Sequence, residues 1–320
     1  MKQTARQIEK QLKKSAKITL VIHQNPDGDA LGSAAAMAGY LSRSKSEPAI
    51  FCATPVPPQL RFLPFAEKIS GDKNIFSEEI DTILLLDCGD LRYAGLADII
   101  PRHPAFVINI DHHPTNEKYG HINLVVPEAA STTEILYSFF KHINARLDRS
   151  MATALLTGIV NDTDNFSNPA TSENSLAVAG ELLRAGANLN LIHNWIVKNK
   201  TISVLKLWGL VLQRLNKNEN LDMAYTFLTK KDILQYGIDD SETEGISNFL
   251  NKLDGARISL LIKETMDGKI KGSFRTTRDD ADVSALAKKM GGGGHKKAAG
   301  FTADGTIEGI LQKIIELQNN

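Results

Sequence analysis

Residues 18–29, ITLVIHQNPDGD, predict the architecture of the first half of the chain. A short apolar run, Ile18–Ile22, leads directly into a polar segment, and a helical pattern follows from Leu31 to Leu41. An apolar run without polar alternation is typical of a strand that is buried on both faces of a parallel sheet. The stretch therefore predicts a strand, a turn with polar side chains, and a helix.

The same pattern recurs along residues 1–188. Apolar, β-branched runs at 49–52, 82–87 and 106–111 predict three more strands, and helical patterns cover 132–142, 151–160 and 172–185. Strands that alternate with helices favour right-handed βαβ units. We expect an α/β domain with a doubly wound, mainly parallel sheet.

The pattern changes in the second half. Residues 189–217 are helical without strand signals and predict a linker helix. Residues 218–320 predict a smaller α/β domain with a mixed sheet, because the strand segments alternate and Met266-Asp267-Gly268 indicates a hairpin turn. Its predicted strands are 221–229, 256–265, 269–277 and 299–302, and its predicted helices are 283–290 and 307–317.

Composition excludes several classes of protein. Among 320 residues, 37 Lys and Arg balance 37 Asp and Glu, which argues against a globally basic nucleic-acid coat protein. Two cysteines, Cys52 and Cys88, are too few for a disulfide framework. No apolar run is long enough to span a bilayer, and the first residues lack the apolar region of a secretory signal. We expect a cytoplasmic protein with reduced cysteines.

Polar, mostly acidic residues follow the predicted strands. The carboxyl ends of parallel strands meet at one edge of the sheet, so these side chains should face one crevice. Carboxylates this close repel one another unless cations neutralise them, and imidazole with carboxylate suits Mn²⁺ or a similar ion. A single Asp there is more often a helix N-cap, and Asp29 could serve as one. The whole set favours two ions with one bridging carboxylate: His23, Asp27, Asp29, Asp87, His112 and Asp162.

The second half contains the run Gly291–Gly294, followed by His295. Between residues 271 and 300, seven basic residues stand against three acidic ones. One interpretation is a flexible linker with solvated lysines. Because residues 298–301 resemble a strand that enters a core, a pocket for a phosphate or nucleotide is the better hypothesis. For Phe274 and Phe301 we favour a core position over a stacking role.

Five motifs carry a resemblance to a known family. HQNPDGDALGS (23–33), LDCGD (86–90), DHHP (111–114) and GIVNDTDNF (158–166) resemble, in order, the four motifs of the DHH phosphoesterase superfamily. GGGGHKKAAG (291–300) resembles the signature of the associated DHHA1 domain. In size, the chain is similar to the short bacterial group of nanoRNases that also act as 3′-phosphoadenosine 5′-phosphate phosphatases.

The resemblance implies roles for the residues that match these motifs. His23 and Asp27 match ligands of a first metal, and Asp87 matches the carboxylate that bridges both metals. His113 matches a histidine that faces the substrate phosphate, and Asp111 matches the acid that supports the histidines. Ligands of the second metal are matched by Asp29, His112 and Asp162. The family's usual metal is Mn²⁺, with Mg²⁺ or Co²⁺ as alternatives.

In the second domain, the resemblance implies a substrate site at Arg275, Gly293, Gly294 and His295, and Arg278 is a further candidate. Three positions depart from the family pattern. Asn161 and Asp164 stand where Thr and Gly are frequent, and Phe301 stands where Gly is frequent.

The expected activity is hydrolysis of short oligonucleotides such as pApA to mononucleotides, and of 3′-phosphoadenosine 5′-phosphate to AMP. A phosphate bound by the second domain would select short substrates over long duplexes. We expect no membrane partner, and the resemblance suggests a homodimer. The alternatives are a cyclic or linear dinucleotide phosphodiesterase and a pyrophosphatase or exopolyphosphatase. An inactive nucleotide-binding module is disfavoured because all six candidate ligands are present.

Overall fold

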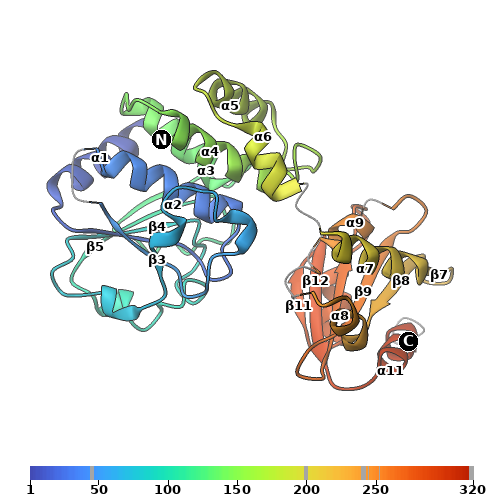
Figure 1. Ribbon diagram of the computed structural model, residues 1–320. Coiled ribbons are helices and arrows are strands. Elements are labelled where there is room, and N and C mark those ends of the chain that lie inside the picture. Colours follow the sequence, from blue (N-terminus) through green and yellow to red (C-terminus); the bar gives the residue numbers. More distant parts are fainter. Residues whose placement is uncertain (44–46, 198–200, 239–242, 244, 252, 317–320) are drawn as a thin grey trace. The chain divides into compact units, whose positions relative to one another are not determined.

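Two separate sheets, each with its own core, organise the chain (Figure 1). The computed structural model describes residues 1–43, 47–197, 201–238, 243, 245–251 and 253–316. The chain divides into two units, Met1–Asn199 and Lys200–Asn320. This arrangement confirms the predicted α/β class. Within the described residues, no helix has the length and apolar character needed to cross a membrane.

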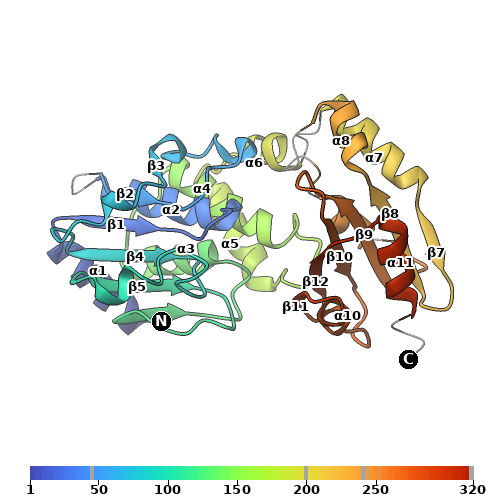
Figure 2. The ribbon, with the colours of Figure 1, turned by 90° about the horizontal axis from the view of Figure 1, so that it is seen from below.

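The first unit contains a parallel sheet with the strand order β3-β2-β1-β4-β5-β6. Figure 2 shows β2, β1, β4 and β5 side by side in this order. The order reverses between β1 and β4, and such a reversal places a crevice at the carboxyl ends of the two strands. The strands are β1 (Ile18–Val21), β2 (Ala49–Phe51), β3 (Ile69–Ser70), β4 (Thr82–Leu86), β5 (Phe106–Asp111) and β6 (Ile122–Val125).

The four strands predicted in this unit are confirmed, whereas β3 and β6 were not predicted. β3 is only two residues long, and β6 is mostly half-buried, so neither gives a clear apolar run.

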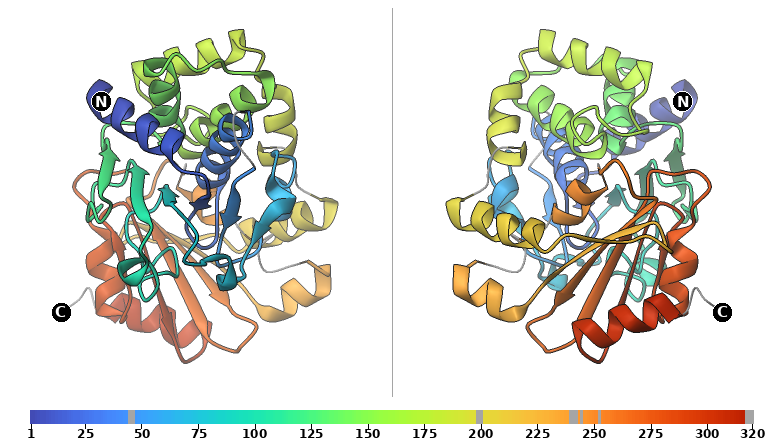
Figure 3. Two further views of the ribbon diagram at one scale, coloured as in Figure 1. Left: turned by 90° about the vertical axis from the view of Figure 1, so that its left-hand side faces the viewer. Right: turned by 90° about the vertical axis from the view of Figure 1, so that its right-hand side faces the viewer.

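One face of this sheet is covered by α-helices. Figure 3 shows the blue and green helices gathered on one side of the strands. Their apolar side chains form one buried cluster with alternate strand residues such as Leu20, Leu84 and Ile108. The helices are α1 (Lys2–Lys14), α2 (Gly28–Leu41), α3 (Thr132–His142), α4 (Arg149–Asp162), α5 (Glu173–Arg184) and α6 (Leu189–Ile192), and a π-helical turn (His193–Val197) follows.

The other face is covered by loops and by short 3-10 helices that include Ile75 and Ile100. Val21, Ile83 and Leu85 point to this side and pack with Leu96 and Ile100. The 3-10 helices of this unit are Pro58–Leu60, Ala66–Lys68, Lys73–Ile75 and Ile100–Arg102.

Glycines allow α2 and α4 to pack closely. A Cβ atom on Gly32 would lie 2.4 Å from the Ala154 carbonyl oxygen, and one on Gly28 would lie 2.8 Å from Cβ of Asn161. Both distances are below van der Waals contact, so larger residues would separate the helices. The close contact brings the N-terminus of α2 beside the C-terminus of α4.

The second unit has a mixed sheet, as predicted, with the order β11-β12-β10-β9-β8-β7. β8 and β9 are parallel, and the other neighbouring pairs are antiparallel. The predicted hairpin joins β9 to β10, and Gly268 has the positive φ of +86° that its turn requires. The strands are β7 (Asn216–Asn218), β8 (Met223–Leu228), β9 (Ile258–Glu264), β10 (Ile270–Arg275), β11 (Gly293–His295) and β12 (Ala298–Ala303).

Helices pack on both faces of this second sheet. α10 (Val283–Lys289) and α11 (Ile307–Glu316) contribute to one core cluster. The opposite cluster is formed with α7 (Ile202–Gln213), α8 (Lys230–Tyr236) and α9 (Ile246–Leu250).

The single linker helix predicted over 189–217 is not what the structure contains. α6, the π-helical turn and α7 share this range, and residues 198–200 lie outside the described part. Leu207 and Val211 of α7 are fully buried in the core of the second unit. The apolar stripe that predicted a helix is therefore a packing face for the second sheet.

Phe301 has a structural explanation. Its side chain is only 3% exposed, and it packs against Phe274 with ring centroids 5.8 Å apart. A Cβ on Gly272, its partner across the β10–β12 ladder, would lie 2.0 Å from the Phe301 ring. Gly272 thus provides the space that the large side chain fills, and Phe274 and Phe301 are both core residues.

We predict that Gly272→Ala destabilises the protein by about 1–3 kcal/mol, because the new methyl group overlaps the Phe301 ring. Gly209→Ala is the matched control, since Gly209 lies in α7 with open space around its Cβ position. That change should stabilise the protein by about 0.5–1 kcal/mol. Denaturant unfolding measures both, and equal effects of the two variants would contradict the packing account.

Candidate metal centre

The polar residues predicted from the sequence meet at the carboxyl ends of β1, β4 and β5. His23 follows β1, Asp87 follows β4, and His112 follows β5. The start of α2 and the end of α4 supply further carboxylates. Three overlapping groups have ligand atoms within 4.8 Å of one another: His23–Asp27–Asp87, Asp29–His112–Asp162 and Asp87–His112–His113.

His23 is oriented by its backbone surroundings. Its Nδ1–H donates to the carbonyl of Gln24 at 2.8 Å, and the Tyr93 ring stacks on it at 4.8 Å. Nε2 then faces the carboxylates, 3.4 Å from Oδ2 of Asp87 and 3.9 Å from Oδ1 of Asp27. An imidazole held through one nitrogen while the other faces acids is the arrangement of metal-binding histidines.

His112 is held in the same way. Its Nδ1–H donates to the carbonyl of Ala129 at 3.3 Å. Its Nε2 lies 3.4 Å from Oδ2 of Asp162 and 3.7 Å from Oδ1 of Asp87. The two oxygens of Asp87 therefore face different histidines, so this buried carboxylate lies between the two groups.

Asp27, and not Asp29, caps α2. The Asp27 carboxylate accepts from the backbone N–H groups of Asp29 at 3.0 Å and Ala30 at 3.1 Å. Asp29 is completely buried, and its carboxylate accepts from the backbone N–H groups of Thr132 at 2.6 Å and Thr133 at 2.9 Å. Asp29 is thus anchored to the first turn of α3, where backbone donors favour a negative charge.

The carboxyl groups of this cluster are buried and repel one another, and few positive charges lie near enough to stabilise their ionised forms. Burial raises the pKa of Asp27, Asp29 and Asp162, and neighbouring carboxylates raise each of them further. Burial opposes ionisation of Asp87 as well, but His23 lowers the pKa of this carboxyl below its usual value. Burial opposes the protonation of His23, but Asp87 raises the pKa of this imidazole to about 9. Carboxylate oxygens combined with two imidazoles are a ligand set that binds divalent metal ions, and such ions would neutralise the charge of the carboxylates.

Asn161 and Asp164, two departures from the family pattern, lie at the end of α4. The Asn161 amide donates to Oδ1 of Asp162 at 3.0 Å, so it helps to orient this carboxylate. Asp164 has a φ of +46°, and Asn165 and Phe166 are also left-handed. Glycine adopts this conformation most readily, and Asp tolerates it better than most residues. The conformation explains why a glycine suits this position.

The orientation of the His113 ring is fixed by a hydrogen bond to a buried carboxylate. Its Nδ1–H donates to Oδ1 of the fully buried Asp111 at 2.7 Å. This hydrogen bond raises the pKa of His113 to about 9, although burial opposes the change. The other oxygen of Asp111 accepts from the amide of Asn116 at 2.6 Å. Asn116 was not predicted, since a polar residue in a loop gives no signal for such a contact.

The predicted substrate residues of the second unit lie at one end of its sheet. Arg275 of β10 and His295 of β11 both stand opposite Ala298 of β12, so they share one face of the sheet. The Arg275 guanidinium is half-buried, and its Nη1 donates to the Phe274 carbonyl at 2.9 Å. Arg278 is exposed beyond the end of β10.

The glycine run is part of this sheet rather than a flexible linker. Gly293 and Gly294 belong to β11, which is exposed and pairs with β12. A Cβ on Gly294 would lie 2.6 Å from Cα of Ala299, and one on Gly292 would lie 2.1 Å from the Gly300 carbonyl oxygen. These two glycines therefore allow β11 to approach β12.

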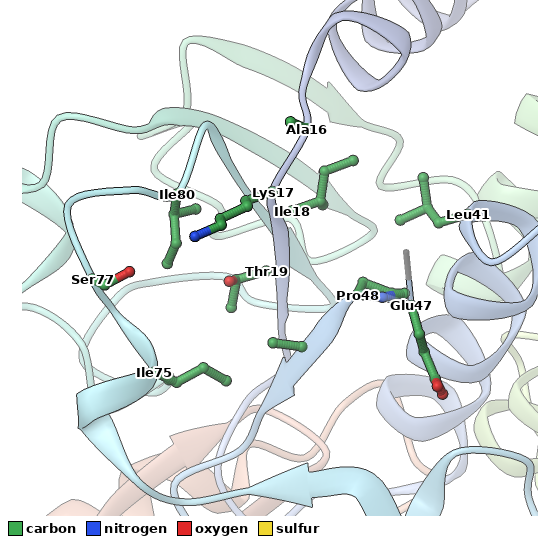
Figure 4. A pocket seen from close by; sticks show the side chains of 11 residues that line it. Ala16, Lys17, Ile18, Thr19, Leu41, Glu47, Pro48, Ile75, Ser77 and Ile80 are labelled. Carbon is green, nitrogen blue, oxygen red and sulfur yellow. The ribbon is translucent and has the colours of Figure 1, made fainter. Parts of the chain in front are cut away.

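A cavity of about 190 Å³ lies elsewhere, at the N-terminal ends of β1 and β2 (Figure 4). Its wall combines apolar side chains with Lys17 and Glu47. Lys17 forms an ion pair with Glu79, and Glu47 forms one with Lys68. Among the described residues, its lining contains no histidine and no Asp, so these residues do not offer the donor set found at the opposite ends of the strands.

Comparison with known proteins gives the family. The model for the DHH family, N-terminal domain, matches residues 17–159, and the model for the DHHA1 domain matches residues 220–320. The chain belongs to the DHH/DHHA1 phosphoesterase family. A DHH phosphoesterase is a metal-dependent enzyme, and the His and Asp groups above provide its candidate ligands.

This DHH/DHHA1 phosphoesterase is similar to curated and solved proteins over nearly its whole length. It is 29% identical to the Bifunctional oligoribonuclease and PAP phosphatase NrnA of Bacillus subtilis, covering 88% of both chains. It is also 29% identical to the protein of that name from Thermus thermophilus, covering 93% of this chain and 88% of that protein. An exopolyphosphatase-related protein from Bacteroides fragilis has a TM-score of 0.92 at 25% identity, covering 99% of this chain and 95% of that one.

We predict that Gly158→Ala disables this phosphoesterase. The new Cβ would lie 2.4 Å from Oδ1 of Asp29 and 2.3 Å from Oγ1 of Thr133, so it displaces a buried carboxylate of the centre. Misplacement of this kind costs about 100-fold in rate, measurable with bis(p-nitrophenyl) phosphate. Gly180→Ala, in open space on α5, is the control and should keep wild-type activity. Unchanged activity of Gly158→Ala would show that activity does not depend on the close approach of α4 to Asp29 and Thr133.

Proposed function

We propose that this phosphoesterase uses two divalent cations, with Mn²⁺ as first choice, to hydrolyse short oligonucleotides such as pApA to mononucleotides. We also propose that it removes a phosphate from 3′-phosphoadenosine 5′-phosphate to give AMP. The observation that carries the proposal is the position of Asp87, whose two oxygens face His23 and His112.

In this proposal, His23 and Asp27 hold one cation and Asp87 is shared by both. The second cation is held by Asp29, His112 and Asp162. Two such cations, when bound, neutralise the buried carboxylates and supply Lewis-acid activation for attack on phosphorus. The groups His23–Asp27–Asp87 and Asp29–His112–Asp162 support this division, and the third group links Asp87 to His112.

The remaining groups act on the substrate. Nδ1 of His113 is occupied by Asp111, so Nε2 is the ring nitrogen that faces the substrate, and in the imidazolium form it donates to an oxygen of the phosphoryl group or of the leaving nucleotide. Asp111 holds this ring. Arg275, Arg278, Gly293, Gly294 and His295 of the second unit bind a phosphate or nucleotide of the substrate. The shared sheet face of Arg275 and His295 supports this role.

The names of the relatives support the choice of substrate. Two proteins at 29% identity are each named an oligoribonuclease and PAP phosphatase. The Bacteroides fragilis protein is titled exopolyphosphatase-related, which makes inorganic polyphosphate a second candidate. Cyclic dinucleotides, which are phosphodiesters, and pyrophosphate, which is a phosphoanhydride, are also open to attack at phosphorus and belong in the same assay.

We predict that the purified protein with Mn²⁺ converts pApA to AMP faster than it degrades a long RNA, and that Asp87→Asn lowers this rate at least about 100-fold. Asp304→Asn, at an exposed position of the second unit, is the control and should retain the rate. Product chromatography compares pApA, 3′-phosphoadenosine 5′-phosphate, cyclic di-AMP, polyphosphate and pyrophosphate. Faster cleavage of long RNA would contradict the preference for short substrates, and full activity of Asp87→Asn would contradict the metal assignment.

A second prediction concerns stability. Mn²⁺ at 100 times its dissociation constant should stabilise the wild-type protein by about 2.7 kcal/mol for each cation bound. The folded-state pKa of Asp162 is raised, so its ionised form destabilises the fold as pH rises above the unfolded pKa. Asp162→Asn should therefore melt above the wild type in EDTA at pH 8, and below it with Mn²⁺. Thermal melting gives both values, and the same order in both buffers would refute the role of Asp162.

A further inference from the structure

His113 is hydrogen-bonded to a buried network of polar side chains. Asp111 and Asn109 of β5 are both completely buried. The Asp111 carboxylate accepts from His113 through Oδ1 and from Asn116 through Oδ2. A buried carboxylate with a donor on each oxygen has little freedom to rotate.

The Asn116 amide is held in one orientation. Its Nδ2 donates to Oδ2 of Asp111 at 2.6 Å and to Oδ1 of Asn109 at 2.8 Å. Its Oδ1 accepts from the backbone N–H of Lys118 at 2.7 Å. A reversed amide would place its oxygen against two acceptors, so only one orientation satisfies these contacts. The backbone N–H of Asn116 also donates to the His113 carbonyl at 3.1 Å, which ties the two residues into one turn.

The network continues to the loop that follows β4. The carbonyl of Cys88 accepts from the hydroxyl of Tyr119 at 2.7 Å and from Nδ2 of Asn109 at 3.3 Å. Nδ2 of Asn109 also donates to the Tyr119 hydroxyl oxygen at 3.0 Å. Cys88 directly follows Asp87, so these contacts link the support of His113 to the backbone beside the shared carboxylate.

We propose that Asn116 is a positioning residue for the phosphoester hydrolysis. It holds the Asp111 carboxylate on the side opposite His113, and so fixes the direction in which Nε2 of His113 points toward the substrate. The inference rests on the proposed function and assigns to Asn116 no contact with substrate or metal. Loss of Asn116 leaves one oxygen of a buried carboxylate without its donor, and Asp111 then no longer fixes the imidazole.

The first test separates kcat from KM. With pApA and Mn²⁺, Asn116→Ala should lower kcat about 10–100-fold and leave KM unchanged, the loss typical of a group that orients a reacting residue. Its stabilisation by Mn²⁺ should equal that of the wild type, because no candidate ligand is changed. Asn74→Ala, at an exposed position whose side chain is outside the network, should behave as wild type. A raised KM with unchanged kcat, or loss of the Mn²⁺ stabilisation, would overturn the proposal.

The second test is a double-mutant cycle with His113→Ala. If Asn116 acts only through His113, Asn116→Ala should cause no further loss of kcat in the His113→Ala background. Additive losses would mean that Asn116 acts by another route, and would also overturn the proposal. Tyr119→Phe, which removes one donor at the far end of the network, should lower kcat less than Asn116→Ala.

A third measurement does not depend on turnover. The proton on Nδ1 of His113, hydrogen-bonded to Asp111, should give a strongly downfield NMR resonance in the wild type and not in Asn116→Ala. Its persistence in the variant would overturn the proposal. If the wild-type protein does not hydrolyse pApA, the proposed function fails, while this resonance still decides the role of Asn116.

Discussion

The close contact of α2 with α4 is the constraint on which the carboxylate cluster depends. Asp27 and Asp29 stand at the start of α2, and Asp162 is the last residue of α4. Helices with ordinary side chains at the contact pack 8–10 Å apart, and glycines allow a closer approach. Gly28, Gly32 and Gly158 therefore determine how near these acids come to one another.

The carboxylate cluster lowers the stability of the fold and at the same time favours the binding of cations. Several buried carboxylates raise each other's pKa, which costs free energy in the folded state. The large apolar cluster of the first unit and the backbone donors at the start of α3 offset this cost. The same uncompensated charge makes the centre attractive to cations, so the feature that weakens the fold is the one that the chemistry needs.

The sequence was sufficient to predict the elements whose signal is local. Short apolar runs without polar alternation indicated β1, β4 and β5, and the polar residues directly after them meet in space, as the rule for parallel sheets requires. It was not sufficient where tertiary contacts decide. Asn116 and Tyr119 are polar loop residues whose partners lie in other elements, and α7 has the pattern of a linker helix but packs into a core. The glycine run gave no strand signal because β11 is held by its backbone alone.

The anchoring of Asp29 has a consequence for the protein without bound cations. Two backbone N–H groups of α3 already serve this carboxylate, and Asp27 is likewise satisfied by the first turn of α2. The polypeptide supplies these partners itself, and no cation is needed for them. Cation binding, as proposed above, would then add stability to a fold in which Asp27 and Asp29 already have hydrogen-bond donors.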